Sequence, residues 1–299
     1  MLPGVCRKRH DKSIGVNLTS LFRLSAELTI QRWKEVWSEI LGKNVRPNYP
    51  AIYATEEFSN MKIIEKVLFH LYRYSLRRLL PAVKPVLYHG IPTGMDHKAL
   101  DRVFPTYKQL YEDIPLYEST LISAITSMVH PRDRVTTVGA GHGTTLVFAA
   151  NSAGPDGQIV CYEASASAIK NSIRTIDRNN LSGRVDFIHA VVGKALSIYG
   201  KGLSHNVIDA ADLEPCDVLE LDCEGAELHI LQELSIRPRI ILVETHGVYG
   251  ATTSDVAAQL QQMGYIVTDL GPAEPRILEK CAKWDLKILK ADRADSTTA

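Results

Sequence analysis

The segment from Arg134 to Gly143 (RVTTVGAGHG) constrains the fold of this chain more than any other. Its β-branched run, 135–138, predicts a buried strand, and residues 144–150 predict the helix that follows. Three glycines spaced two apart lie between them: Gly139, Gly141 and Gly143. Glycines in a strand-to-helix turn allow positive φ and let a ligand touch bare backbone, beside a helix N-terminus that favours a carboxylate or phosphate. The segment therefore predicts an α/β fold with a ligand site at this turn.

The spacing of these glycines separates two classes of cofactor. A dinucleotide-binding turn would place glycines at 139, 141 and 144, but residue 144 is Thr. Glycines at alternate positions suit the turn that holds S-adenosylmethionine in Rossmann-like methyltransferases. Since glycine-rich turns are common, this prediction depends on the segments that follow. The backbone of residues 139–143, Ala140 included, would hold the amino-acid carboxylate of that cofactor.

Composition limits the class of protein and suggests two parts. With 299 residues, 45% hydrophobic and 23% charged, the chain is typical of one large globular domain or two small ones. The net charge is zero, but residues 1–110 hold 18 Lys and Arg against 9 Asp and Glu, and residues 111–299 hold 16 against 25. We therefore predict a basic, mainly helical N-terminal extension and connector (1–110) and an acidic catalytic domain (111–299).

The cysteines and the hydropathy pattern predict a cytoplasmic protein. Five cysteines, without a C-x-x-C pair, disfavour a disulfide framework or a zinc knuckle and fit a reducing compartment. No apolar run reaches the ~18 residues of a membrane span. Peripheral contact at the inner membrane face is an open alternative, because a helix predicted at 60–80 has a basic side that would suit anionic lipid. The other interpretation packs this helix against the acidic domain.

The pattern of predicted secondary structure changes near residue 115. Residues 21–41 and 60–80 have helical periodicity, and residues 81–115 are rich in Pro and Gly, which predicts a connector. Strands then alternate with helices, as in a parallel sheet covered on both faces. Seven strands are predicted, at residues 134–139, 158–163, 185–189, 217–222, 239–245, 265–269 and 285–289. The predicted fold class is α/β, with a Rossmann-like seven-stranded, mostly parallel sheet and a helical N-terminal extension.

Candidate cofactor residues follow the first strands, because ligands of such sheets bind beyond the carboxyl ends of the strands. The second strand ends at Glu163, 20 residues after Gly143, where a carboxylate suits two ribose hydroxyls. The third strand is followed by Ala190, whose backbone and small side chain suit an adenine edge. The predicted cofactor-binding residues are Gly139, Ala140, Gly141, Gly143, Glu163, Ala164, Ala190 and Asp222.

Acidic residues and a histidine follow the fourth and fifth strands. Asp222, Glu224 and Glu227 lie within six residues, and a helix cap and its dipole account for the first two but not for Glu227. Glu244 and His246 are two residues apart on a strand and therefore point to the same face. We predict an acid/base cluster of His246, Asp222, Glu244 and Glu224.

Taken in order, these segments resemble a known enzyme family. The stretches VGAGHG, YEAS, DVLELDCEGAEL and ILVETH are similar to those of FkbM-like S-adenosylmethionine-dependent methyltransferases, over about residues 117–290. The resemblance implies a seven-stranded Rossmann-like fold and methyl transfer to oxygen, commonly a hydroxyl of a sugar or natural product. It also implies that Gly139, Gly141 and Glu163 hold the cofactor while Asp222 and Glu224 line the cleft.

The chain departs from this family at two positions. The family usually has an acid inside the first strand, where this chain has Thr136 and Thr137, and a Pro after the acid of the second strand, where this chain has Ala164. The first departure leaves open which group contacts the amino group of the cofactor. The N-terminal 110 residues lie outside the resemblance.

The predicted chemistry is removal of a proton from an acceptor hydroxyl as it attacks an activated methyl group. A positioned base contributes ~10²–10⁴-fold to such a step. We predict His246 as the base, with Asp222 or Glu244 as alternatives. These side chains are also of metal-ligand type, but no His-x-x-x-His pair or comparable spacing supports a metal, and none is predicted.

Two other functions stay open. A nucleic-acid methyltransferase is disfavoured, because Asp222-Cys-Glu-Gly differs from the (Asp/Asn)-Pro-Pro-aromatic ending of amino-methylating enzymes and an acidic cleft repels phosphates. The other is an inactive module of the same fold that binds a partner or a membrane surface through its basic N-terminal helices. The predicted partner is a small-molecule or glycan acceptor, with no nucleic acid.

Overall fold

The computed structural model describes residues 68–103, 112–193 and 203–294. The chain divides into two compact units, Met1–Tyr49 and Pro50–Ala299, and the described residues all belong to the second. The helix predicted at residues 21–41 and the first part of the helix predicted at 60–80 lie outside the described residues. The domain division at residue 110 stays a prediction.

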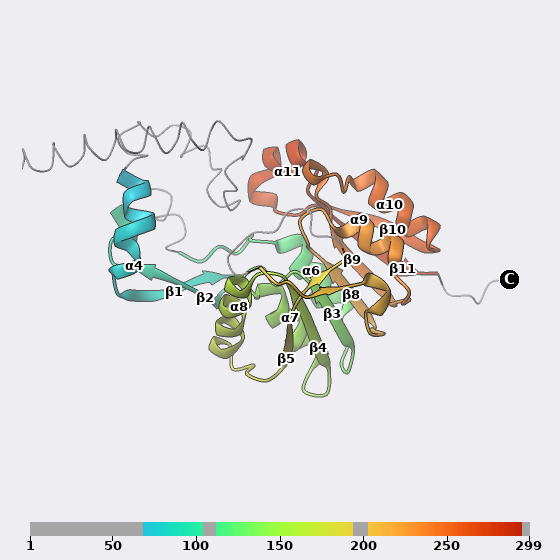
Figure 1. The fold of residues 1–299 in the computed structure, drawn as a ribbon, viewed down its shortest axis with the longest axis horizontal. Coiled ribbons are helices and arrows are strands. Elements are labelled where there is room, and N and C mark those ends of the chain that lie inside the picture. Colours follow the sequence, from blue (N-terminus) through green and yellow to red (C-terminus); the bar gives the residue numbers. More distant parts are fainter. Residues whose placement is uncertain (1–67, 104–111, 194–202, 295–299) are drawn as a thin grey trace, which may run out of the picture. The chain divides into compact units, whose positions relative to one another are not determined.

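A seven-stranded sheet forms the centre of the described unit, in the order β10-β11-β9-β8-β3-β4-β5 (Figure 1). Five strands run parallel, and β11 is antiparallel to both of its neighbours. The strands are β3 (Arg134–Val138), β4 (Gln158–Glu163), β5 (Val185–His189), β8 (Val218–Leu221), β9 (Ile240–Glu244), β10 (Tyr265–Pro272) and β11 (Lys287–Arg293). The central strands β3, β8 and β9 are buried along almost their whole length, as in parallel sheets covered on both faces. The predicted seven-stranded, mostly parallel fold is confirmed.

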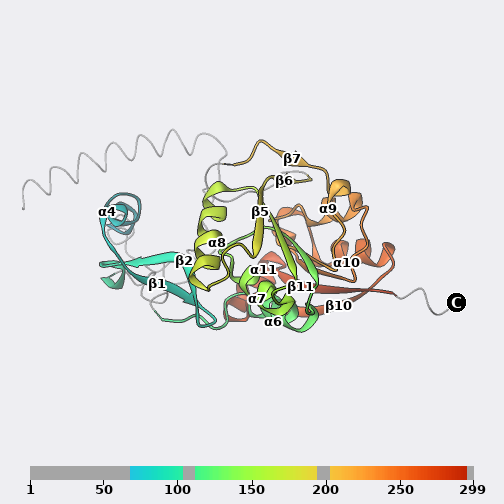
Figure 2. The same ribbon diagram turned by 90° about the horizontal axis from the view of Figure 1, so that it is seen from below.

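Helices cover both faces of this sheet and enclose two hydrophobic cores (Figure 2). The helices are α6 (Ser119–Met128), α7 (Thr144–Ala153), α8 (Ala166–Arg178), α9 (Glu227–Glu233), α10 (Thr253–Gln262) and α11 (Leu278–Trp284). One core takes Leu121 from α6 and Leu146 from α7, and the other takes Ile230 from α9 and Leu260 from α10. Burying each such side chain contributes about 1.5–3 kcal/mol, so the sheet is a rigid support for the loops at its edge.

A β-hairpin lies within the segment that the sequence analysis assigned to a connector. It consists of β1 (Ala82–Tyr88) and β2 (Ile91–Lys98), paired antiparallel. Its turn residues, His89 and Gly90, both have positive φ, as tight hairpin turns require. The hairpin packs on α8: Arg174 and Arg178 contact the Asp96 carboxylate at 2.5 and 2.7 Å. The Pro- and Gly-rich segment is therefore folded against the sheet domain.

Short elements complete the described chain. Residues 68–79, before the hairpin, are helical and include η2 (Tyr72–Leu76), a π-helix, and α4 (Arg77–Leu79). Four 3₁₀ turns are η3 (Asp101–Val103), η5 (Ala210–Asp212), η6 (Gly247–Tyr249) and η7 (Pro275–Ile277). Strands β6 (Val191–Val192) and β7 (Val207–Ile208) form a small parallel pair next to the sheet.

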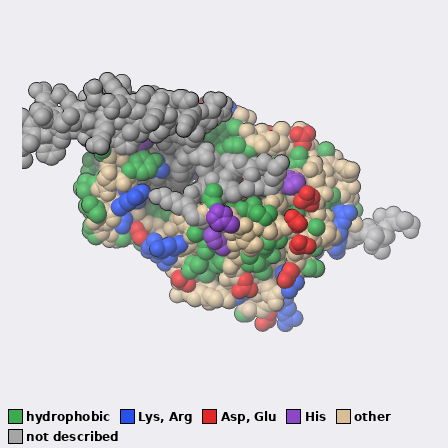
Figure 3. Space-filling view, viewed as in Figure 1, with side chains coloured by type: hydrophobic (Ala, Val, Ile, Leu, Met, Phe, Trp, Pro, Cys, Tyr) green, Lys and Arg blue, Asp and Glu red, His purple; other side chains and the backbone are tan. Residues whose placement is uncertain are grey.

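The surface carries side chains of every kind (Figure 3). On the face drawn there, most acidic side chains gather on one half. The helical residues before the hairpin expose Leu68, Leu71, Tyr74, Leu76 and Leu79. In the described part of the chain, no helix has the length and apolar character needed to cross a membrane. The peripheral membrane contact predicted for residues 60–80 stays a prediction.

Candidate active site

The glycine turn lies between β3 and α7, as its sequence predicts. Gly139 has φ +103°, and a Cβ built there would lie 1.9 Å from the carbonyl oxygen of Asp222. A side chain at this position would therefore collide with the end of β8. Gly141 also has positive φ, but a Cβ built on it would meet no atom within 4 Å. The turn is thus packed tightly at its start and open at its middle, where a ligand can approach the backbone.

The Glu163 carboxylate joins the end of β4 to this turn. It accepts hydrogen bonds from the backbone N–H groups of Ala140 and Ser165, both at 2.7 Å. Burial raises the pKa of Glu163, because only 8% of the residue is exposed, and the charge of Asp222 adds to the rise. The backbone N–H of Ala190 in turn donates to the carbonyl oxygen of Glu163 at 3.1 Å. The predicted cofactor residues on β3, β4 and β5 therefore lie together at one edge of the sheet.

Helix α8 holds the glycine turn from the side, an arrangement that the sequence analysis missed. Thr175 Oγ1 donates to the carbonyl oxygen of His142 at 2.6 Å and accepts from the backbone N–H of Gly94 at 2.7 Å. One hydroxyl thus connects the hairpin, α8 and the turn. Nothing in the local sequence around Thr175 signals this role, because its two partners lie 33 and 81 residues away.

His142, within the glycine turn, packs against aromatic rings. Its ring lies 5.7 Å from that of Tyr88 and 6.0 Å from that of Tyr117, centroid to centroid. Burial lowers the pKa of His142 to about 4, so the ring is neutral at physiological pH. Aromatic rings from the hairpin and from the chain before α6 therefore lie beside the glycine turn.

The four predicted acid/base residues come together beyond the ends of β8 and β9. His246 Nε2 lies 3.6 Å from Asp222 Oδ1, 3.8 Å from Glu224 Oε2 and 3.8 Å from Glu244 Oε1. The two strands are parallel neighbours, with Leu221 opposite Val243, so the residues just beyond them align. His246 is 5% exposed, whereas 35% of the Glu224 side chain is exposed. Glu224 is therefore the member of the cluster that solvent reaches best.

Glu227 explains how the histidine is held. It lies in the first turn of α9, is fully buried, and its Oε1 is 2.8 Å from His246 Nδ1. The same oxygen accepts from the backbone N–H groups of Cys223 and Gly225 at 3.1 and 3.2 Å. The sequence analysis noted that capping and dipole effects leave Glu227 unexplained, and that observation was the available signal for its contact with His246.

Mutual charge and burial shift the protonation of this cluster. Burial alone would lower the pKa of His246, but the hydrogen bond that its Nδ1 donates to Glu227 and the charges of Glu227, Glu224 and Glu244 outweigh it and raise that pKa well above the usual value. Burial raises the pKa of Glu224 to about 7, and it also raises the pKa of Glu244. These shifts favour the doubly protonated form of the His246 ring and the protonated forms of Glu224 and Glu244.

Two further carboxylates lie near the cluster, and the sequence analysis missed both. Glu118, which precedes α6 with φ 48°, has its pKa raised by burial and by the charge of Asp222. Glu220 is 1% exposed, and its carboxylate accepts from Thr137 Oγ1 at 2.8 Å. Thr137 occupies the strand in which the family usually carries an acid, so in this chain the neighbouring strand brings a carboxylate to that place.

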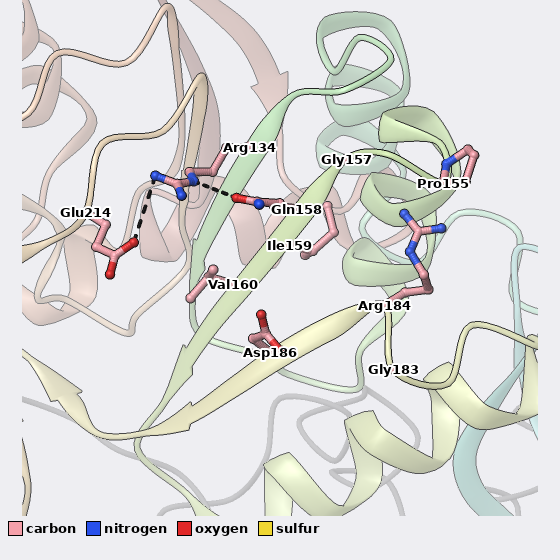
Figure 4. Close-up of a pocket in the computed structure, with 10 residues that line it drawn as sticks. All are labelled: Arg134, Pro155, Gly157, Gln158, Ile159, Val160, Gly183, Arg184, Asp186 and Glu214. Carbon is pink, nitrogen blue, oxygen red and sulfur yellow. Dashed lines mark hydrogen bonds and ion pairs between the residues drawn. The ribbon is translucent and has the colours of Figure 1, made fainter.

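A hollow at the opposite edge of the sheet does not belong to this site (Figure 4). Its lining includes the first residues of β3 and β4, Arg134 and Gln158, which hydrogen-bond to each other at 2.9 Å. Because parallel strands begin there, this edge is far from the loops at which such sheets bind ligands. The candidate site is the carboxyl edge, with the glycine turn, Glu163 and the His246 cluster.

Comparison with protein families gives the class of this domain. Residues 126–267 match the family described as the methyltransferase FkbM domain. The resemblance found in the sequence is confirmed over that range. The matched residues run from the end of α6 to the start of β10 and so include the glycine turn, Glu163 and the His246 cluster.

Solved structures resemble this chain only distantly. The precorrin-6y C5,15-methyltransferase of Geobacter metallireducens is 14% identical, with a TM-score of 0.39 over 59% of this chain and 88% of that one. An O-methyltransferase of Thermotoga maritima is 16% identical, with a TM-score of 0.40 over 62% of this chain and 68% of that one. The O-methyltransferase TomG of Streptomyces achromogenes is 14% identical, with a TM-score of 0.40 over 66% and 87%. No curated protein matches the chain.

Proposed function

We propose that this chain is an S-adenosylmethionine-dependent O-methyltransferase that acts on a hydroxyl of a sugar, a glycan or a small natural product. One observation carries the proposal: the cofactor turn and the acid/His cluster are contiguous. Gly139 at the start of the turn packs directly against the carbonyl of Asp222, whose side chain belongs to the cluster. A methyl donor in the turn would therefore lie beside groups that can take a proton.

The residues of the turn fit the cofactor. The open backbone around Gly141, at the N-terminus of α7, suits the methionine carboxylate. Each oxygen of Glu163 accepts one backbone N–H, and a carboxylate oxygen has a second lone pair, so both can also accept from ribose hydroxyls. Ala164 and Ala190 follow β4 and β5, where they would border the adenine. Bound there, the sulfonium supplies an already activated methyl group.

The protein's part in the reaction is alignment and acceptance of a proton. The acceptor hydroxyl loses its proton to a carboxylate as its oxygen forms a bond to the methyl carbon, and the carbon–sulfur bond breaks with its electron pair left on sulfur. The sequence favoured His246 as base, but its ring is buried and its Nδ1 is held by Glu227. We assign the proton to Glu224, the most accessible carboxylate of the cluster. His246 provides a neighbouring positive charge, and Asp222 and Glu244 lie beside its ring and orient it.

Calorimetry tests the cofactor directly. We expect the full chain to bind S-adenosylmethionine at one site and NADH not at all. Binding of NADH instead, or of neither compound, would contradict the proposal. Mass spectrometry of glycans and small metabolites from a strain that lacks the gene, compared with the parent strain, then identifies the acceptor as the compound without its methyl group.

A further inference from the structure

The acid/His cluster contains three atoms that are placed like the ligands of one cation. One carboxylate oxygen of Asp222, one of Glu244 and a ring nitrogen of His246 all lie within 4.8 Å of one another. They come from the ends of two adjacent parallel strands, β8 and β9. The site is thus built on rigid elements and not on a mobile loop.

The distances in this group are too long for hydrogen bonds. His246 Nε2 is 3.6 Å from Asp222 Oδ1 and 3.8 Å from Glu244 Oε1, whereas N–H···O bonds are about 2.9–3.0 Å long. Two ligands that are each about 2.1 Å from a common ion lie roughly 3.0 Å apart in octahedral and roughly 3.4 Å apart in tetrahedral geometry. A contraction of about 0.2–0.8 Å would bring His246 Nε2 to those separations from the Asp222 and Glu244 oxygens.

The hydrogen bond to Glu227 is an independent observation that points to a ligand. With Nδ1 bound to a fully buried carboxylate at 2.8 Å, the lone pair of a neutral His246 ring is on Nε2. His246 is 5% exposed, and among the described residues Nε2 has no hydrogen-bond partner and lies 3.6–3.8 Å from oxygens of Asp222, Glu224 and Glu244. A carboxylate that orients a histidine from behind is the usual second partner of a metal-binding imidazole.

We propose that Asp222, Glu244 and His246 bind a divalent transition-metal ion, with Glu227 positioning the imidazole. One imidazole nitrogen with two carboxylates suits Mn²⁺, Fe²⁺ or Zn²⁺, whereas Mg²⁺ and Ca²⁺ favour oxygen ligands alone. The ion would also offset the mutual repulsion of three carboxylates, those of Asp222, Glu244 and Glu224. The sequence predicts no metal because these ligands have no characteristic spacing along the chain. They come together only where two adjacent strands end.

The ion would also take part in methyl transfer, and this role rests on the proposed function. A divalent ion lowers the pKa of an oxygen beside it, so an acceptor hydroxyl there would lose its proton more readily. Glu224, whose Oε2 is 3.8 Å from His246 Nε2, stays available to take that proton. The proton still goes to Glu224 and the electron pair of the broken bond to sulfur, but the ion and not a protonated His246 would then supply the neighbouring positive charge.

Metal binding is measured on the full chain without the cofactor. Mn²⁺ is titrated and the free ion is followed by electron paramagnetic resonance, with Zn²⁺ titrated in parallel by calorimetry. We expect one Mn²⁺ per chain and tighter binding of Zn²⁺, following the usual order of affinity. Asp222→Asn and Glu244→Gln should each weaken Mn²⁺ binding at least tenfold, and Glu227→Gln should weaken it ~10- to 100-fold.

The matched control is Glu233→Gln on the same helix as Glu227, because this half-exposed carboxylate faces His229 and not the cluster. It should bind Mn²⁺ as the wild type does, and circular dichroism verifies that each variant is folded. If one ligand variant is unfolded, the other ligand variant and Glu227→Gln still decide the question. The absence of saturable binding of either ion, or equal affinity in folded ligand variants and wild type, would overturn the proposal in favour of a doubly protonated His246.

The two proposals fail separately. Binding of S-adenosylmethionine in the presence of a chelator is measured on the same preparation. A chain that binds the cofactor but neither Mn²⁺ nor Zn²⁺ is a methyltransferase without this site. A chain that binds one Mn²⁺ through Asp222 and Glu244, but no S-adenosylmethionine, has the metal site without the proposed function.

Discussion

Two buried glutamates organise the site at the scale of single residues. Glu163 accepts one backbone N–H from the glycine turn and one from the turn after β4, and Glu227 accepts two from the turn after β8. Each therefore fixes a turn to a neighbouring part of the sheet edge, Glu163 at the glycine turn and Glu227 at the turn before α9. Carboxylates in these positions compensate orphan backbone donors that would otherwise be buried without partners.

Glu163→Gln tests the cofactor role of the first of them. A glutamine has a single acceptor oxygen, so its NH₂ group would face one of the two backbone donors and leave it unsatisfied, at a cost of about 1–3 kcal/mol. We expect S-adenosylmethionine to bind roughly 5- to 150-fold more weakly, measured by calorimetry. Glu233→Gln is the control and should bind as the wild type does. Equal affinity in Glu163→Gln and wild type would exclude Glu163 from the cofactor site.

Gly139→Ala tests the packing of the turn against β8. The new Cβ would lie 1.9 Å from the Asp222 carbonyl, in addition to requiring a positive φ. We expect a loss of unfolding free energy of about 2–5 kcal/mol, the sum of a left-handed backbone and an overpacked contact. Gly264→Ala is the matched control, because Gly264 has φ +84° but open space around its Cβ position. Urea denaturation that gave both variants the same stability would contradict the predicted collision.

At the scale of elements, the sequence predicts those strands whose bounds depend on residues close to them in the chain. Strands β4 and β5 have the predicted bounds, because the apolar runs there end at turn or capping residues such as Ser165, whose side chain accepts from Ala168 N. The hairpin was not predicted, since Pro85 and Pro92 disfavour a strand interior. In a two-stranded sheet each strand has a free edge, so a proline is tolerated, and the register shifts near Pro85.

The same division applies to the candidate site. Glu163, Asp222, Glu244 and His246 could be predicted, because the carboxyl ends of parallel strands converge. The contacts from Thr175 and Glu118 could not, since they depend on how α8 and α6 pack against loops distant in sequence. The order of the strands along the chain is enough to predict that their ends converge. The side-chain partners of a helix can be predicted only when the orientation of that helix is known.

Asp96→Asn tests whether the hairpin is fixed to the sheet domain. Asp96 is mostly buried and accepts from Arg174 at 2.5 Å and Arg178 at 2.7 Å, so its neutral analogue would lose charge-assisted hydrogen bonds worth about 1.5–3 kcal/mol each. We expect faster hydrogen exchange in β2 and lower stability in urea. Asp186→Asn, an exposed position on β5, is the control. Unchanged exchange in β2 would show that the ion pairs do not hold the hairpin.

At the scale of the whole molecule, the two regions should respond to pH in opposite ways. Burial raises the pKa of Glu163 at the site, so this group favours the folded state more at low pH. Near the hairpin, Asp101 is fully buried, and hydrogen bonds from Tyr72 and Arg77 and from the Lys98 backbone more than offset burial and hold its pKa below the usual range. Acid therefore weakens the hairpin region before it weakens the sheet.

The pH dependence of Asp101→Asn decides whether this network contributes to acid sensitivity. The folded pKa of Asp101 lies below the unfolded value of about 3.9, so its contribution is fully present above that pH and is lost as the pH falls below it. We expect the stability difference between wild type and variant, measured in urea, to be large at pH 7 and pH 5 and to shrink steadily below pH 4. Asp186→Asn should show a small difference at every pH. A difference for Asp101→Asn that grew on acidification would reverse the predicted sign and place the acid-sensitive group elsewhere.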